Sequence, residues 1–417
     1  MISRTRICMA LAAAALCSVG NSVWTAELSS QHRSNPPSAP NPPQTPPPSS
    51  PPPTAFGDPL PGLSSTLSAA FAAGLETFQE VDTPASGLGP IFNNVSCVAC
   101  HSTPAPGGGS TILETRFGRL ANGQFDPLTE LGGSLLQQQA IDPHVQEVIP
   151  PEANVIAHRI TTPLFGAGLI EAIPDAEILL VALQRRPDGI SGRLSLVTDV
   201  ASGRTRVGRF GWKAQHATLL SFAGDAYLNE MGITNRLFPT ENAPNGNTAL
   251  VAQYDTVADP EDVTDPTTGK ADIDMFADFM RMLAPPPTLP LSSDGKAGKS
   301  LFSQIGCSNC HVPSMVTGRS NIPAFNVQPV ALYSDLLLHD MGSLGDGIGQ
   351  GVAAPGEMKT APLWGLRART AYLHDGRATT VDAAITLHDG EAAAARSRYT
   401  GLSATQKQQL LEFLGSI

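Results

Sequence analysis

The segments CVACH (Cys97–His101) and CSNCH (Cys307–His311) decide the fold of this chain of 417 residues. In each, two thiols three positions apart can form thioether bonds with the vinyl groups of a haem, and the adjacent imidazole can bind the iron as an axial ligand. A redox dithiol or half of a zinc site would also use this cysteine spacing. Because both copies end in His and both follow a similar helical segment, we interpret them as two covalent haem sites. The chain is therefore predicted to be a di-haem c-type cytochrome.

The other cysteines add no further thiol site. Of six cysteines, Cys8 and Cys17 lie in an apolar N-terminal stretch, and the remaining four belong to the two motifs. A mature chain without that stretch would have no thiol left for disulfide or thiol chemistry.

The N-terminus has the order of a secretory signal. Two arginines precede an apolar run over residues 7–19, which is too short to span a bilayer comfortably, and small or polar residues follow near Gly20. We expect residues 1–20 to be a signal peptide and the mature protein to be soluble in the periplasm. A lipid anchor at Cys17 is the alternative, although the preceding Leu16 fits a lipid-acceptor site poorly.

Residues 21–62 are predicted to form a disordered, proline-rich spacer. The part from Asn35 to Gly62 holds thirteen of the 37 prolines and few apolar side chains, so it cannot bury a core. It should sample extended polyproline geometry, at about 3.1 Å per residue.

The charge of the chain restricts its partners. The formal net charge is −11, and removal of a signal with two arginines would make it −13. We therefore expect no binding to nucleic acid or anionic lipid, and a basic docking partner. The residues after the spacer are numerous enough for two haem domains with sizeable cores.

The pattern around the two motifs indicates a duplication. Apolar residues recur at helical spacing before each motif, and the pentapeptide GLETF from Gly74 corresponds to GKSLF from Gly298. These apolar positions are Leu67, Phe71, Leu75 and Phe78 before the first motif, and Ala297, Leu301 and Phe302 before the second.

Each half is also predicted to close with a helix. One helix runs through Ile273, Phe276, Phe279, Met280 and Leu283 and ends before three prolines. The other begins at a capping box of Ser403 and Gln406 and continues through Leu410, Leu411, Phe413 and Leu414.

The predicted fold is therefore mostly α, with two cytochrome c-like haem domains in tandem over residues 63–287 and 288–417. The first domain carries a long insertion, in which residues 194–200 and 204–210 are predicted to form a small β-hairpin. An acidic stretch over residues 255–265 lacks the glycine and terminal glutamate of an EF-hand loop. This favours a solvated loop over a calcium site. Calcium remains a possible third cofactor beside the two haems.

Six segments together resemble the di-haem oxidoreductase family that is often labelled thiol oxidoreductase, which is related to bacterial di-haem cytochrome c peroxidases and to MauG. They are PLFGAGLIEAIPD from Pro163, DGISGR from Asp188, GRFGWKAQ from Gly208, DAYLNEMGITN from Asp225, DLLLHDMG from Asp335 and PLWGLRARTAYLHDGRATT from Pro362. The resemblance extends over nearly all of residues 63–417. The thiol label fits poorly, because no unmodified cysteine is expected in the mature chain.

The resemblance implies a sixth ligand for the second haem. In the similar peroxidases this ligand lies fourteen residues after the histidine of a YxHxG segment, which here leads from His374 to His388. Those relatives use Met or Tyr at this position, so His388 implies bis-histidine ligation and a lower potential than Met would give. Met341 and Met358 are the rival ligands, and His388 could instead be a surface histidine.

For the first haem, the resemblance implies an open, catalytic iron with an acid or amide above it. The candidates are Glu230, Gln215 and His216, of which a distal acid would move a peroxide proton. Trp212 is either an electron bridge between the haems or a core residue. Haem propionates could pair with three arginines. These are Arg367, Arg369 and Arg377.

The predicted function is that of a periplasmic, peroxidase-like oxidoreductase, in which the C-terminal haem relays electrons to a catalytic N-terminal haem. The expected partners are a small redox protein as donor and peroxide or another small oxidant. A non-enzymatic electron carrier with two fully ligated irons is one alternative. A MauG-like oxidase of a protein or polymer substrate is another. A haem-uptake protein with removable haem is disfavoured by the thioether links.

Overall fold

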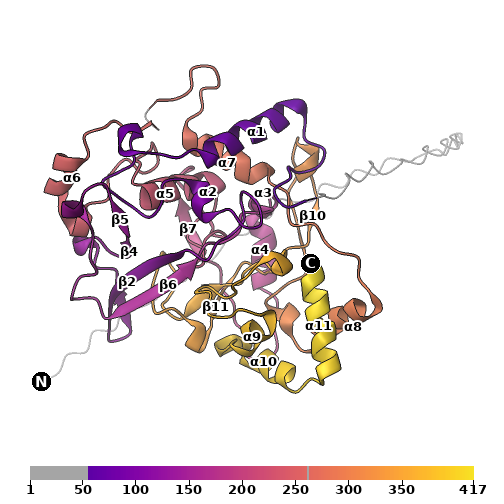
Figure 1. Ribbon diagram of the computed structural model, residues 1–417. Coiled ribbons are helices and arrows are strands. Elements are labelled where there is room, and N and C mark those ends of the chain that lie inside the picture. The colour runs from indigo at the N-terminus through magenta and orange to yellow at the C-terminus, as the bar shows by residue number, and fades with distance from the viewer. Residues whose placement is uncertain (1–54, 261–262) are drawn as a thin grey trace, which may run out of the picture. The chain divides into compact units, whose positions relative to one another are not determined.

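In each half of the structure, the helix before the haem motif packs against the helix that closes that half (Figure 1). Helix α1 (Ser65–Gln79) lies on α7 (Asp272–Met282), and α8 (Ser293–Gln304) lies on α11 (Ala404–Ser416). At each of the two points where these helices cross, the first helix of the pair has a glycine. A Cβ atom on Gly74 would lie 2.5 Å from the Met275 carbonyl oxygen, and one on Gly298 would lie 1.9 Å from that of Gln409. The correspondence between GLETF and GKSLF thus marks the same close helix contact in both halves.

The computed structural model describes residues 55–260 and 263–417. These residues all belong to one compact unit. The predicted signal peptide, most of the predicted spacer, and two acidic residues of the stretch considered for calcium lie outside the described residues.

The described part of the chain contains both helices and strands, with 36% helix and 15% strand. The prediction of a mostly α fold was therefore too simple, because the insertion in the first half adds a sheet and several short strand pairs. The remaining α-helices are α2 (Cys97–Cys100), α3 (Ala167–Glu171), α4 (Asp175–Ala182), α5 (Leu219–Met231), α6 (Thr248–Tyr254), α9 (Val381–Thr386) and α10 (Ala393–Thr400).

The largest sheet is antiparallel and centres on β2 (Leu113–Ala121), which pairs with β3 (Gln124–Asp126), β4 (Leu135–Leu136) and β6 (Val155–Ile160) (Figure 1). Thr115 of β2 lies opposite His158 of β6 in the register. Since successive side chains alternate between faces, Glu114 and Arg116 lie on the same face of β2.

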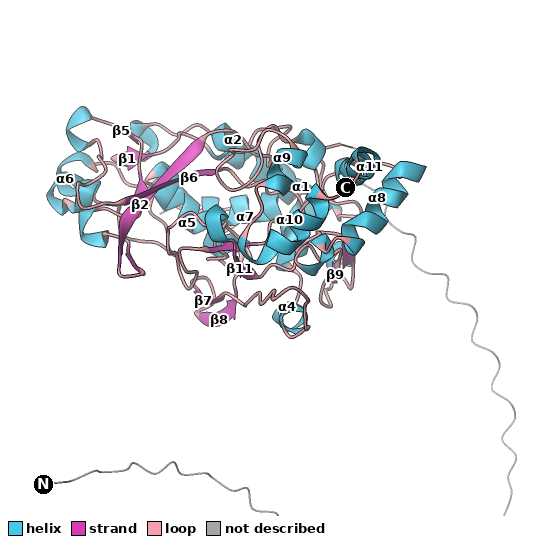
Figure 2. Ribbon diagram, turned by 90° about the horizontal axis from the view of Figure 1, so that it is seen from below, coloured by secondary structure: helices cyan, strands magenta, loops and turns pink. Residues whose placement is uncertain are grey.

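The other strands form two-stranded pairs. The predicted hairpin is present as β7 (Leu196–Asp199) and β8 (Arg204–Val207), and Figure 2 shows it at the edge of the described unit near α4. The remaining pairs are β1 (Ile91–Phe92) with β5 (Gln139–Ala140), β9 (Met315–Val316) with β10 (Pro329–Val330), and β11 (Leu338–Asp340) with β12 (Glu357–Lys359).

The two helix pairs contribute to separate hydrophobic cores. The larger core joins α1, α3, α5 and α7, and it includes Leu332, Leu336 and Leu337 from the second half of the chain. The smaller core joins α8 and α11 through Phe302, Phe413 and neighbouring residues. The two halves therefore share side chains near their junction. The predicted capping box of Ser403 and Gln406 begins α11.

No helix in the described part of the chain is long and apolar enough to cross a membrane.

Candidate haem sites and candidate active site

The first motif places its histidine for iron binding. Cys97 and Cys100 bound the short helix α2, and His101 follows directly. The Nδ1 atom of His101 lies 3.1 Å from the Gly108 carbonyl oxygen. Because a carbonyl can only accept, Nδ1 must be the donor, so the Nε2 lone pair remains for a metal. Burial lowers the pKa of His101 to about 4, which keeps the imidazole neutral as a ligand must be.

The second motif repeats this arrangement and adds a second imidazole. The Nδ1 atom of His311 lies 2.9 Å from the Tyr333 carbonyl oxygen, and that of His388 lies 2.8 Å from the Ala384 carbonyl oxygen. The two ring centres are 6.5 Å apart. Two metal–imidazole bonds of about 2 Å each, plus the distance from each nitrogen to its ring centre, require about this separation. Burial lowers the pKa of both histidines, for His311 to about 4.

Both motifs open into cavities. Cys307, Cys310, His311 and His388 line the second cavity, which has about 1390 Å³ of unfilled space including the part open to solvent. Cys97, Cys100 and His101 line the first cavity, which has about 1790 Å³ on the same measure. All four cysteines in the described part of the chain are free, and burial raises the pKa of the Cys97 and Cys307 thiols to about 12. Buried thiols of raised pKa are not reactive, which disfavours a redox dithiol.

Two half-buried cations, Lys359 and Arg369, line the second cavity without a carboxylate partner within 4 Å among the described residues. Burial lowers the pKa of Lys359 to about 8 and that of Arg369 to about 10. Buried charges need a counter-charge, and haem propionates would supply one. Lys359 was not among the sequence candidates, because a lone lysine on β12 carries no signal.

The other two sequence-predicted arginines lie outside this cavity lining. Arg367 donates to the backbone carbonyl oxygens of Pro287 and Ile417, with its guanidinium over the Phe56 ring. Arg377 is exposed and pairs with Asp375. The rival ligands Met341 and Met358 both line the second cavity beside His388.

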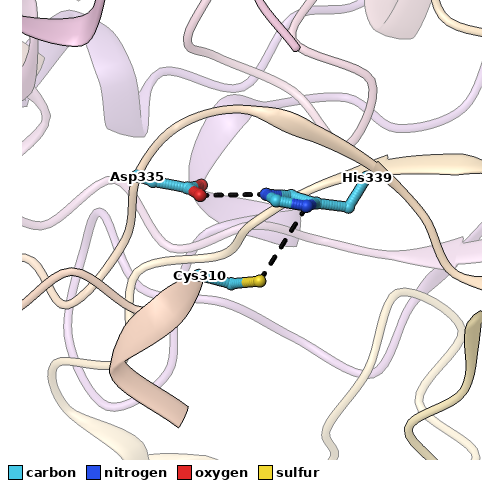
Figure 3. Close-up of side chains that lie close together, drawn as sticks. All are labelled: Cys310, Asp335 and His339. Carbon is cyan, nitrogen blue, oxygen red and sulfur yellow. Dashed lines mark hydrogen bonds and ion pairs between the residues drawn. The ribbon is translucent and has the colours of Figure 1, made fainter. Parts of the chain in front are cut away.

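Cys310, Asp335 and His339 form a close group at the wall of the second cavity (Figure 3). His339 Nε2 lies 2.9 Å from Asp335 Oδ2, and Nδ1 lies 2.6 Å from Glu391 Oε2 and 3.8 Å from Cys310 Sγ. Burial alone would lower the pKa of His339, but these partners raise it to about 12. A doubly ion-paired imidazolium has no lone pair for a metal. The ion pairs of His339 therefore fix this side chain beside the attachment residue Cys310.

The wall of the first cavity is rich in acids. Glu230 of α5 accepts a hydrogen bond of 2.8 Å from Asn93 Nδ2. Burial and the neighbouring Glu114 raise the pKa of Glu230 to about 7, against the opposing effects of Arg116 and Asn93. Glu114 and Arg116, which the sequence reasoning missed, form an ion pair and line the same cavity from β2.

Gln215 and His216 are neighbours in sequence but have different positions. Gln215 lines the first cavity, and its buried Oε1 atom has no hydrogen-bond partner. Such an orphaned acceptor indicates a missing donor from a bound group or water. His216 does not line the cavity; its Nε2 atom lies 3.1 Å from Asp225 Oδ2, and Asp225 does line it.

Trp212 borders both haem cavities. Its Nε1 atom donates to the Ile160 carbonyl oxygen at 2.9 Å, and its ring lies edge-on to that of His374 with centres 6.3 Å apart. The ring is thus held between the two sites by a hydrogen bond and an aromatic contact.

A buried charge cluster ties the two halves together near Trp212. Arg159 Nε donates to Asp346 Oδ2 at 2.8 Å, and Lys213 Nζ lies 2.8 Å from Asp346 Oδ1. All three side chains are at most 2% exposed. Burial alone would raise the pKa of Asp346, but the two cations hold it below its usual value.

Calcium is not supported by this geometry. The only group of three metal-ligating His, Cys, Asp or Glu side chains in the described part of the chain is the one in Figure 3. The described acids of the stretch considered for calcium, Asp255, Asp259 and Asp265, do not form such a group.

Two covalent attachment motifs, each with a free axial imidazole and a cavity, define a di-haem c-type oxidoreductase. Residues 144–417 match the family described as "Di-haem oxidoreductase, putative peroxidase". The chain belongs to this family, whose name implies two haems and a peroxide substrate. The second motif lies within the matched residues, and the first precedes them.

Several solved structures are similar to the chain at low identity. Hydrazine synthase of Kuenenia stuttgartiensis is 16% identical, with 85% of this chain and 88% of that chain covered and a TM-score of 0.38. The diheme peroxidase BthA of Burkholderia thailandensis is 14% identical, with coverage of 85% and 86% and a TM-score of 0.39. A MauG-like protein associated with microbial copper homeostasis is 17% identical, with coverage of 61% and 88% and a TM-score of 0.32. Comparison with curated proteins gives no match.

Proposed function

We propose that this protein is a periplasmic di-haem peroxidase that reduces a peroxide at the first haem with electrons relayed by the second. The observation that carries the proposal is the difference between the two cavities. The second has a histidine opposite its motif histidine, whereas His101 is the only histidine in the lining of the first. When bound, a haem whose iron keeps an open ligand position can bind peroxide. A haem whose iron is fully ligated mainly transfers electrons.

The residues of the second cavity suit a haem that relays electrons. His311 and His388 hold neutral, oriented imidazoles at a spacing that fits an iron between them. Lys359 and Arg369 would neutralise the propionates and fix the cofactor in its plane. If both imidazoles bind the iron, no position is left for peroxide there, which supports the first site as the place of the chemistry.

The first cavity is built for proton transfer. Glu230, with a pKa of about 7, can accept the proton of an incoming peroxide and return it to the departing oxygen. Arg116, which lines the same cavity, would stabilise negative charge on that oxygen, and Gln215 Oε1 could accept a hydrogen bond from the peroxide or from a water beside it. His216 acts through Asp225, so it is a positioning residue.

Electrons would pass between the cavities through Trp212 and His374, whose rings are in contact at the junction. The acidic chain should receive them from a basic small redox protein. Export to the periplasm is part of the proposal, because attachment of haem through thioethers takes place outside the cytoplasm.

One observation favours a second candidate function, that of a pure electron carrier. Met231 and Met280 both line the first cavity, and a methionine thioether could close the first iron. Both residues are also packed in the larger hydrophobic core, which accounts for them without an iron.

A combined experiment separates the two functions. Purified holoprotein, with two covalently bound haems confirmed by mass, is examined by electron paramagnetic resonance and then mixed with hydrogen peroxide and a reduced small cytochrome. We expect one high-spin and one low-spin haem, with consumption of peroxide and oxidation of the cytochrome. Two low-spin haems and no consumption of peroxide would establish the electron carrier instead.

A further inference from the structure

Tyr227 lies in the wall of the first cavity, beside the residues that would attach the haem. It belongs to α5 and is 2% exposed. Its ring lies edge-on to that of Phe276, with ring centres 5.1 Å apart. The charges of Asp82 and Asp272 contribute to the raised pKa of Cys97, so both acids lie close to the attachment cysteine. Tyr227 thus lines the cavity, and the two acids, which do not line it, lie near the phenol and the attachment cysteine.

The phenol has a built-in proton acceptor. Tyr227 Oη donates a hydrogen bond of 3.0 Å to Asp272 Oδ2, at the first turn of α7. Burial, Asp272 and Asp82 raise the pKa of the phenol well above its usual value, so Tyr227 keeps its proton in the resting protein. A phenol that loses an electron becomes strongly acidic, and a carboxylate within hydrogen-bond distance can take its proton without any rearrangement.

We propose that Tyr227 is a redox-active residue that donates one electron to the oxidised first haem, with Asp272 taking the proton. The inference rests on the proposed peroxide chemistry and adds a place where the protein itself stores one oxidising equivalent. Such a store would matter when peroxide arrives and no reduced donor is docked.

The electron and proton balance is closed. Reduction of hydrogen peroxide to two waters takes two electrons and two protons. The two protons come from solvent, and without a donor one electron comes from the haem iron and one from Tyr227. The Tyr227 O–H bond breaks, the electron goes to the haem, and the proton goes to the Asp272 carboxylate. The products on the protein are a neutral tyrosyl radical, a carboxylic acid and an iron that has lost one electron. Two later electrons from the donor, with return of the proton from Asp272, restore the phenol and the iron.

The test is electron paramagnetic resonance of oxidised holoprotein that is frozen after mixing with hydrogen peroxide in the absence of a donor. We expect an organic radical signal whose hyperfine structure narrows in protein made with ring-deuterated tyrosine. Tyr227→Phe should lower the yield of this radical on the order of tenfold, while both haems stay attached by mass. Asp272→Asn keeps a side chain of the same size but cannot take the proton, so it should also lower the yield.

Tyr399→Phe is the matched control. Tyr399 is fully buried and donates a hydrogen bond of 2.5 Å to Asp382, but it belongs to the smaller core and does not line the first cavity. Its loss should leave the radical unchanged. A radical that persists in Tyr227→Phe, or the absence of any deuterium-sensitive signal in the unmutated protein, would overturn the inference. Normal peroxide consumption with such a result would leave the proposed function standing, whereas no consumption at all would remove both.

Discussion

The imidazole of His388 faces that of His311 across the second cavity, with ring centres 6.5 Å apart and ring planes inclined by 57°. Each ring is held by a hydrogen bond from Nδ1 to a backbone carbonyl, so their orientation does not depend on a metal. The protein alone thus orients both imidazoles, as the proposed bis-histidine ligation requires.

Replacing His388 tests this directly. His388→Ala should turn the low-spin signal of the second haem into a high-spin signal, because no imidazole remains on that side. His388→Met should keep six coordination and raise the reduction potential. Absorption, electron paramagnetic resonance and a redox titration measure these changes. A low-spin second haem that survives in His388→Ala would assign the ligand to Met341 or Met358 instead.

Glu230→Gln should lower the second-order rate with hydrogen peroxide by roughly 10²–10⁴-fold, because the amide cannot accept the proton. In the unmutated protein this rate should rise with pH through a pKa of about 7, and the rise should be lost in the variant. Stopped-flow absorption across the pH range measures both. Glu241→Gln is the control: Glu241 is also a buried acid of raised pKa but does not line the first cavity. An unchanged rate in Glu230→Gln would exclude Glu230 as the proton acceptor.

The same pKa has an effect on stability. Since the folded pKa of Glu230 lies above its ordinary value, the folded state holds more protons than the unfolded state between about pH 4.5 and 7. The contribution of Glu230 to stability is therefore present below this window and is lost as the pH rises through it. Denaturant unfolding of the holoprotein should show a steeper decline in stability over this window than Glu230→Gln does. Identical pH profiles for the two proteins would contradict this.

Trp212→Phe should slow electron transfer between the haems several-fold and leave peroxide binding to the first haem unchanged. The variant keeps a ring at the junction but loses the indole and its hydrogen bond to Ile160. Rapid mixing of protein carrying a reduced second haem with peroxide reports the transfer. Trp364→Phe provides the control, since Trp364 is a buried tryptophan that lines neither haem cavity. Equal transfer rates in both variants would make Trp212 a core residue.

Gly74→Ala and Gly298→Ala should each destabilise the protein by about 1–3 kcal/mol, because the added methyl would overlap a backbone carbonyl at a helix crossing. Gly415→Ala, in α11, meets no atom within 4 Å and should stabilise by up to about 1 kcal/mol. Thermal unfolding of the holoproteins compares all three. Neutral effects at both crossings would mean that the helices can move apart at little cost.

The frame of the fold follows from local sequence patterns. The helices α1, α7, α8 and α11 have regular apolar spacing and clear end signals, and the haem motifs are short and contiguous. The resemblance points to His388 through its fourteen-residue spacing from His374, and the fold places its ring opposite that of His311. The four-stranded sheet was missed, since β2 and β6 expose apolar Leu113 and Ile156 while β6 buries Arg159, which blurs the alternation of apolar and polar positions.

The walls of the cavities were harder to predict. Glu114 and Glu230 come from a strand and a helix far apart in sequence, and only the folded chain brings both to one cavity. Arg367 and Arg369 look equivalent in sequence, but the backbone turns between them, so that only Arg369 lines the second cavity. Three-dimensional placement, and not residue type, separates such candidates.

The buried ion pairs of Asp346 with Arg159 and Lys213 hold the two halves of the structure in a fixed relative position. Moving Asp346 away from Arg159 and Lys213 while these side chains stay buried would leave their charges unpaired, at a cost of several kcal/mol. The gap that an electron must cross should therefore stay constant through the redox cycle. The rate of electron transfer between the two haem sites would then be fixed by the fold. Donor docking and peroxide supply would remain as the steps a cell can regulate.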